Sequence, residues 1–179
     1  EDSVSGTGSF DIGSAIINKL TLVLNNIYET YSEYDFTDAV VIPYVGLELP
    51  DGTIEKIRRG LFTVDEASYD GSLITLSCLD EMYKLDYAYS ESSLTYPATL
   101  SEIVQDACYV CGATLLTTTF NNSSYTVQKR PDDESLTFRQ VLSWAAQIAC
   151  SWARFDVYGR LRFDWYDQSV FETHDGLNG

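Results

Sequence analysis

Hydrophobic and polar residues alternate through much of the first half of the chain, which is typical of strands with one buried face. The alternating runs span residues 20–24, 39–49, 53–68 and 73–79. Two Asp-Gly pairs, Asp51-Gly52 and Asp70-Gly71, join the last three runs. Asp-Gly favours tight hairpins because glycine adopts positive φ without strain. The pattern therefore predicts an antiparallel meander of four or more strands, forming a partial barrel.

The alternation also predicts which side chains share a face. Phe62, Val64 and Glu66 are expected on one face of their strand, and Ile74, Leu76 and Cys78 on one face of the next. Pro43 indicates an edge or a bulge, since proline cannot donate to a ladder. Residues 25–38 show no clear period and are expected to form a loop.

The hydrophobic period changes to that of a helix after residue 97. Thr99 and Glu102 have the spacing of a capping box, and Thr137 and Gln140 repeat it. Apolar residues then recur at helical intervals in both segments. Gly112 supplies a stop signal for the first helix. The sequence predicts two amphipathic helices, and the acidic run at 132–134 is expected to favour the start of the second.

Short strands are predicted at residues 115–118 and 125–128, and a hairpin at 152–165. The whole pattern indicates an α+β fold, in which an antiparallel β meander is followed by a small two-helix α+β domain. We expect three parts. These are an antiparallel β domain at 1–92, an α+β domain at 93–166, and a tail at 167–179 that starts a second barrel.

The net charge of the chain limits the classes of molecule that it is expected to bind. The chain has 27 acidic and 11 basic residues and a formal net charge of −16. Such a chain is expected to repel phosphate backbones and anionic lipid surfaces, so we expect no specific nucleic-acid binding and no membrane association. No apolar run reaches the length of a transmembrane helix, and no signal peptide is recognisable. Because an initiator methionine is also missing, we expect a fragment or a processed product.

The clearest candidate for metal or redox chemistry is the Cys-x-x-Cys pair of Cys108 and Cys111. A structural zinc site needs four ligands, whereas Cys78 and Cys150 are isolated and the single histidine is His174. A redox pair would stand at the start of a helix, where the dipole lowers the thiol pKa, but this pair stands at the end. We therefore expect core packing and neither a metal nor a cofactor. A zinc-stabilised adaptor remains an alternative.

Acidic pairs are the remaining candidates for catalysis. They are Asp65-Glu66, Asp80-Glu81 and Asp132-Asp133-Glu134. Neighbours on a strand point to opposite faces, so the first pair is not expected to converge. The third run lacks the ligand spacing of an EF-hand. With no histidine beside a nucleophile, the sequence predicts no active site and no enzyme.

The tyrosine clusters and the tryptophans are the candidates for a binding surface. The tyrosines cluster as Tyr28, Tyr31 and Tyr34, and as Tyr83, Tyr87 and Tyr89. Tyrosine is enriched at protein interfaces, although a β-rich surface also carries it. Trp144, Trp152 and Trp165 follow helix and strand patterns, so burial is expected for them in place of an exposed sugar-binding platform.

Three consecutive stretches resemble a bacteriophage and prophage tail hub (baseplate hub) family, similar in fold to the hubs of contractile tails. They are FTVDEASYDGSLITLSCLDEMYKLD (62–86), LTYPATLSEIVQDACYVCGATL (94–115) and RPDDESLTFRQVLSWAAQIACSWARFDVYGRLRF (130–163). The resemblance covers about residues 10–166 and contains no catalytic signature. It implies a tail-tip ring of three copies, each with two tube-type barrels and α+β insertions. This chain ends where the second barrel would begin.

The resemblance also implies a function. The ring would link the tail tube or distal tail protein to the tip or spike, and would let DNA and the tape-measure protein pass. A negative channel wall that does not retain DNA fits the acidic composition. We therefore expect a structural protein of the virion tail, made in the host bacterial cytoplasm, that self-associates as a homotrimer in full length. The alternative is a carbohydrate-binding or weakly hydrolytic domain that acts on cell-wall polymers.

Overall fold

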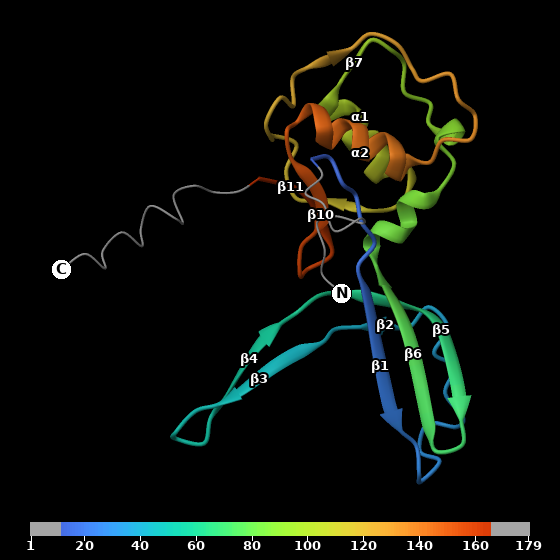
Figure 1. Ribbon diagram of the computed structural model, residues 1–179, viewed down its shortest axis with the longest axis vertical. Helices are drawn as coiled ribbons and strands as arrows, with labels where there is room; N and C mark the ends of the chain where they lie inside the picture. Colours follow the sequence, from blue (N-terminus) through green and yellow to red (C-terminus); the bar gives the residue numbers. More distant parts are fainter. Residues whose placement is uncertain (1–11, 166–179) are drawn as a thin grey trace, which may run out of the picture.

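A computed structural model describes residues 12–165 and shows the predicted α+β fold (Figure 1). A four-stranded antiparallel sheet forms one end of the molecule, and two packed helices with a short hairpin form the other. A two-stranded arm projects sideways near the junction between these parts.

The first part contains six strands. They are β1 (Lys19–Asn25), β2 (Val40–Val41), β3 (Tyr44–Glu48), β4 (Ile54–Arg58), β5 (Phe62–Asp70) and β6 (Leu73–Asp80). The main sheet has the order β1-β6-β5-β2, and every pairing in it is antiparallel. The predicted antiparallel sheet is thus confirmed, with β5 and β6 joined by the Asp70-Gly71 turn.

Two of the predicted long strands are each broken into two shorter ones. The break falls at Pro43 in one and at Gly60 in the other, and the backbone N–H of Arg59 donates to the Pro43 carbonyl across the break (2.8 Å). Proline offers no N–H to a ladder, and at Gly60 an added Cβ would lie 2.4 Å from the Phe62 ring. Strands β3 and β4 therefore pair with each other as a separate hairpin, which we call the arm (residues 44–58).

The predicted shared face of Phe62, Val64 and Glu66 is wrong at Glu66. A bulge lies between Val64, which pairs with Cys78, and Glu66, which pairs with Ser77. The extra residue reverses the alternation, so Glu66 is exposed while Ala67 takes the inward position. Strand β6 has no bulge, and Ile74, Leu76 and Cys78 are buried on one face as predicted.

Both predicted helices are present with complete capping boxes. Helix α1 spans Leu100–Val110 and α2 spans Phe138–Ile148. The Gln140 N–H donates to the Thr137 hydroxyl oxygen (3.3 Å), and the Thr137 N–H donates to Gln140 Oε1 (2.9 Å). The acidic run 132–134 lies just before the N-cap of α2, as expected, but none of its residues is in the first turn. Asp133 instead accepts hydrogen bonds from Ser135.

Short strands and 3₁₀ helices complete the helical part. They are η1 (Glu81–Asp86), η2 (Tyr89–Glu91), β7 (Ala98–Thr99), β8 (Thr114–Leu115), β9 (Thr126–Val127), β10 (Trp152–Phe155) and β11 (Arg160–Asp164). The predicted hairpin is confirmed as β10 paired with β11. The strands expected at 115–118 and 125–128 are only two residues long, because each pairs briefly with a distant segment, β8 with β11 and β9 with β7.

The buried apolar side chains form two clusters. The smaller one lies on the main sheet and is built on Val64 and the inward face of β6. The larger one surrounds the two helices, and it includes Ala15, Met82, Leu85 and Tyr89 from the first half of the chain. The helical part thus takes side chains from both halves of the chain. The predicted tail at 167–179 lies outside the described residues.

Candidate interaction surfaces

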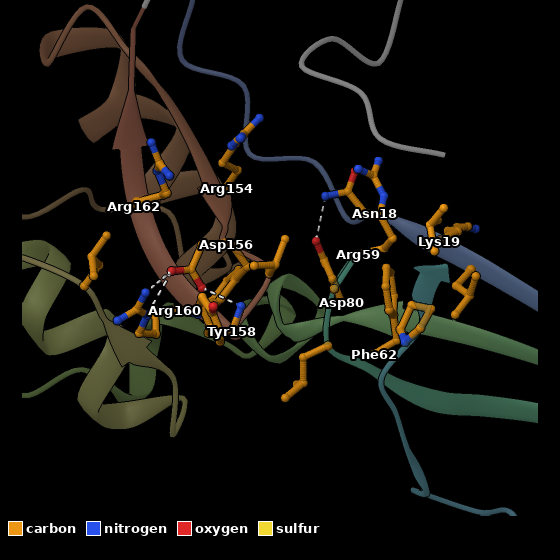
Figure 2. A pocket seen from close by; sticks show the side chains of 18 residues that line it. Asn18, Lys19, Arg59, Phe62, Asp80, Arg154, Asp156, Tyr158, Arg160 and Arg162 are labelled. Carbon is orange, nitrogen blue, oxygen red and sulfur yellow. Dashed lines mark hydrogen bonds and ion pairs between the residues drawn. The ribbon is translucent and has the colours of Figure 1, made fainter. Parts of the chain in front are cut away.

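A groove of about 580 Å³ lies where the sheet, the arm and the β10–β11 hairpin meet (Figure 2). Its walls come from the start of β1, the base of the arm, the β4–β5 connection, the end of β6 and the hairpin. Residues from several distant stretches of sequence therefore build one concave surface. Apolar side chains also contribute to it, among them Pro43, Val45 and Phe62.

Basic side chains dominate the charged groups of this groove. Those that line it are Lys19, Arg59, Arg154, Arg160 and Arg162, against the acids Asp80 and Asp156. Arg58 lies beside this group and stacks on Tyr158, another lining residue, with its guanidinium carbon 5.0 Å from the centre of the ring. Six of the eleven basic residues of the chain thus gather here.

Ion pairs hold the hairpin arginines in place. Arg154 and Arg162 lie opposite each other in the ladder, and both pair with one carboxylate, Asp164 (2.8 and 2.5 Å). Arg160 pairs with Asp156 (2.7 Å), whose pKa is held below its ordinary value by hydrogen bonds with Arg160, against the opposing effect of burial. The three arginines of the hairpin are thus paired with two carboxylates, those of Asp156 and Asp164, so these groups together keep a net positive charge.

The tip of the β10–β11 hairpin packs against the end of β4 and the connection that follows it. Arg160 also lies over the Tyr158 ring, with its guanidinium carbon 5.1 Å from the centre, so two cations share this ring. Gly159 adopts a φ of +74°, and a Cβ there would stand 3.2 Å from Leu61. A side chain at Gly159 would be strained and crowded, so the close approach depends on glycine.

Asp80 is the most buried acid of the groove, with 4% of its surface exposed. It caps η1 by accepting from the Met82 N–H (3.1 Å), and it accepts from Asn18 Nδ2 (2.8 Å). Burial raises the pKa of Asp80 to about 6, more than these hydrogen bonds lower it. Its neighbour Glu81 pairs with Lys84. Both carboxylates of this pair are thus committed to internal contacts.

A second exposed surface lies on residues 26–38, which we call the acidic loop. The sequence predicted a loop here, and the buried Asn26 organises it: Asn26 Oδ1 accepts from the Tyr31 N–H (2.8 Å), and Asn26 Nδ2 donates to the Ser32 hydroxyl (3.1 Å). The Tyr69 hydroxyl of β5 donates to the Tyr34 carbonyl (3.1 Å). The loop therefore has a defined shape. Its charged residues are all acidic: Glu29, Glu33, Asp35 and Asp38.

The two tyrosine clusters differ in exposure. In the acidic loop, Tyr28 is 90% exposed and Tyr34 60%. In the other cluster Tyr89 belongs to the core, where its ring meets Phe138 edge-on (5.1 Å between centres) and its hydroxyl lies 2.7 Å from that of Tyr96. The second cluster is therefore no continuous surface of tyrosines.

The arm exposes apolar side chains from both of its strands. They are Tyr44, Val45, Leu47, Ile54 and Ile57, each more than half exposed. Val45, Leu47 and Ile57 lie on one face of the arm, and Tyr44 and Ile54 lie on the other. A two-stranded hairpin has little stability of its own in water, and exposed apolar side chains of this kind are typical of surfaces that bind another chain. The sequence did not indicate the arm, because its residues fit the alternating pattern of longer half-buried strands.

The cysteines are placed as a packing role requires. Cys108 is buried among the residues of the larger cluster, and Cys111 packs at its margin. Burial raises the pKa of Cys108 to about 12 and that of Cys111 to about 11, so both thiols are protonated at neutral pH. Cys78 is buried in the sheet cluster and Cys150 is exposed. Within residues 12–165 no group of three or more metal-ligating side chains comes together, and His174 lies outside that range.

The predicted burial of the tryptophans is confirmed for Trp152 and wrong for the other two. Trp152 is 7% exposed, whereas Trp144 is 44% and Trp165 47% exposed. Trp144 lies off the apolar stripe of α2, and Trp165 follows the last residue of β11. The Asp65-Glu66 pair stands at the bulge, with both residues exposed.

The groove arginines carried a signal that sequence reasoning missed. Arg160 and Arg162 are two positions apart on a predicted strand, so they share a face, and Arg154 lies on the partner strand. Nothing in the sequence indicated that Arg58 and Arg59 lie close to the hairpin arginines, because this proximity depends on contacts between distant segments.

Comparisons with known proteins find a similar fold among solved structures. No protein-family model matches the chain, and no curated protein matches it. Among solved structures, the fold is similar to that of the 43 kDa tail protein of prophage MuSo2 from Shewanella oneidensis, with a TM-score of 0.54 and 18% sequence identity. The match covers 86% of this chain and 48% of that one, so this chain spans about half the length of that protein. None of the helices in residues 12–165 is long and apolar enough to span a membrane.

Proposed function

We propose that this chain is a structural component of a bacteriophage or prophage tail. The observation that carries the proposal is the fold shared with a prophage tail protein over 86% of the chain. The exposed arm and acidic loop support a role in assembly, because both present apolar or aromatic groups that a neighbouring chain could bury.

Within the tail, the chain belongs to the tail tip. In this proposal the full-length protein forms a homotrimeric hub ring that joins the tail tube or distal tail protein to the spike, and DNA passes through its centre. The net charge of −16 suits a channel wall that must not retain DNA. The role is structural and the protein acts in the virion tail after its synthesis in the host cytoplasm.

The direct test is the native mass of the full-length parent protein by light scattering, with negative-stain images of the same peak. The proposal predicts a trimer that appears as a ring with a central hole. A compact particle without a hole, in the presence of its tail neighbours as well as alone, contradicts the hub assignment.

A second candidate, binding or slow hydrolysis of cell-wall polysaccharide, draws on the groove itself. Asp80, with its raised pKa, and Asp156, with its lowered pKa, line the same groove, and glycosidases use such carboxyl pairs. Both carboxyls are already bonded within the chain, which favours the structural role. Turnover of purified wall polymer, abolished by Asp80→Asn, would instead favour this candidate.

A further inference from the structure

The groove is a positive site on a strongly negative chain. Among the described residues, Lys19, Arg58, Arg59 and the three hairpin arginines gather with the carboxylates of Asp80, Asp156 and Asp164 that line the groove or pair with its arginines. In the described part of the chain neither Arg58 nor Arg59 forms an ion pair, and Arg58 Nε is buried without a hydrogen-bond partner. These six cations and three carboxylates sum to +3, so the rest of the chain carries a net charge of −19 within the overall −16.

The chemistry of the groove favours a peptide ligand that carries both carboxylates and aromatic rings. Arginine binds carboxylates through two parallel hydrogen bonds, and it also stacks on aromatic faces, as Arg58 and Arg160 already do on Tyr158. Pro43, Val45 and Phe62 add apolar surface beside these cations. A phosphate or a single small anion would leave that apolar surface uncovered.

The acidic loop has the composition that this groove would accept. Its charged residues are four acids, and two of its tyrosines, Tyr28 and Tyr34, are largely exposed. Tyrosine and arginine are the residue types that most often dominate the energy of protein interfaces. The loop and the groove thus match in both charge and residue type.

The exposed tyrosines of the loop and Glu33 cannot reach the groove of the same chain. Lys19 at the start of β1 lines the groove, whereas the loop begins directly after Asn25 at the other end of that strand. Seven residues of extended strand span about 23 Å. Residues 26–34 stay near that far end, because the Tyr34 carbonyl accepts from Tyr69 beside the β5–β6 turn, and only the last residues of the loop return along the sheet to β2. When this part of the loop is the ligand, it must therefore come from a second copy.

We propose that the acidic loop of one copy docks in the basic groove of the next copy, in a head-to-tail contact. The inference rests on the proposed function, because a tail ring requires contacts between copies. Such a contact joins two different surfaces and builds a closed ring when its rotation closes, or an open chain when it does not. Arg59 and Glu33 form the charge pair that we use to test it, since both are exposed and no ion pair within residues 12–165 involves them.

Self-association of this chain is measured by analytical ultracentrifugation at about 50 mM salt, where exposed charges are weakly screened. The unchanged chain is expected to self-associate, and added salt is expected to weaken this association. Arg59→Glu and Glu33→Arg should each raise the dissociation constant at least about tenfold. The chain that carries both changes should recover most of the affinity, because the pair is restored with its signs exchanged.

Mixing the two single variants gives a sharper result. Arg59→Glu keeps an intact loop and Glu33→Arg keeps an intact groove, so one good contact can form between them. The mixture is expected to associate about as well as the unchanged chain, with the two variants alternating, because the intact loop meets the intact groove and the two changed surfaces restore the pair with its signs exchanged. An interface that used one surface twice would not show this complementation.

Two matched variants serve as controls. Lys129→Glu after β9 and Glu91→Arg on η2 make the same charge changes at exposed positions outside the groove, the acidic loop and the arm. The inference is overturned by an unchanged chain that stays monomeric to about 1 mM, by controls as damaging as the test variants, or by a double variant without recovery. The proposed function has a separate readout, because the full-length ring is seen by microscopy whatever contact forms it.

Discussion

Replacing Met82 by alanine tests how the two parts of the chain are connected. Met82 lies in η1, directly after the last strand of the sheet, yet its side chain is fully buried in the cluster around the helices. Loss of a buried methionine side chain costs about 2–5 kcal/mol, because transfer energy is lost and a cavity remains. We therefore expect Met82→Ala to lower the free energy of unfolding of the helical part by about 3 kcal/mol.

Tryptophan fluorescence during urea unfolding is the assay. All three tryptophans, Trp144, Trp152 and Trp165, lie in the helical part or at the end of its hairpin, so their emission reports that part alone. With a denaturant dependence of about 1.5 kcal/mol per M, the midpoint should fall by about 2 M. Met82→Leu conserves volume and should change stability by less than about 1.5 kcal/mol.

The reasoning is refuted if Met82→Ala leaves the tryptophan midpoint unchanged while the circular dichroism of the strands is lost earlier. That outcome would assign residue 82 to the sheet. Leu76→Ala, which removes a buried side chain from the sheet cluster, serves as the reciprocal variant.

Three further predictions follow from single contacts. Thr137→Ala removes the cap of α2 and should lower stability by about 1 kcal/mol in urea unfolding, whereas Thr137→Ser should keep it. Burial raises the folded pKa of Asp80 from 3.8 to about 6, so between about pH 4 and pH 6 the folded state holds a proton that the unfolded state has lost. The contribution of Asp80 to stability therefore falls as the pH rises through that window. Asp80→Asn should stabilise the chain at pH 7.5 by up to about 3 kcal/mol and have little effect at pH 4, and equal effects at both pH values would contradict the shift. Exposed Cys150 should react quickly with a thiol reagent and buried Cys108 only on unfolding, and fast labelling of Cys108 in the native chain, located by peptide mass mapping, would contradict its packing.

The local signals in the sequence predicted the elements that depend on local contacts. The capping boxes at Thr99 and Thr137 and the turn at Asp70-Gly71 each involve residues within a few positions of one another, so the sequence contains all the partners. The alternation of β6 was equally reliable, because one face of that strand is buried along its whole length.

Non-local features were not predictable in this way. The bulge at Asp65 adds one residue without any glycine or proline to mark it, and it reverses the faces of β5 from there on. The separation of the arm depends on breaks in two strands that face each other, at Pro43 and Gly60. The groove combines several distant segments, so the gathering of its basic side chains is evident only in the folded chain.

The central claim is that this chain belongs to a phage tail, and the most direct measurement is its location in assembled particles. Antibody raised against this chain and coupled to gold would be applied to purified particles from an induced lysogen or a lytic stock of the parent phage. The account predicts that the protein is present in those particles and that the gold lies at the distal end of the tail. Absence of the protein from intact, infectious particles would contradict the account.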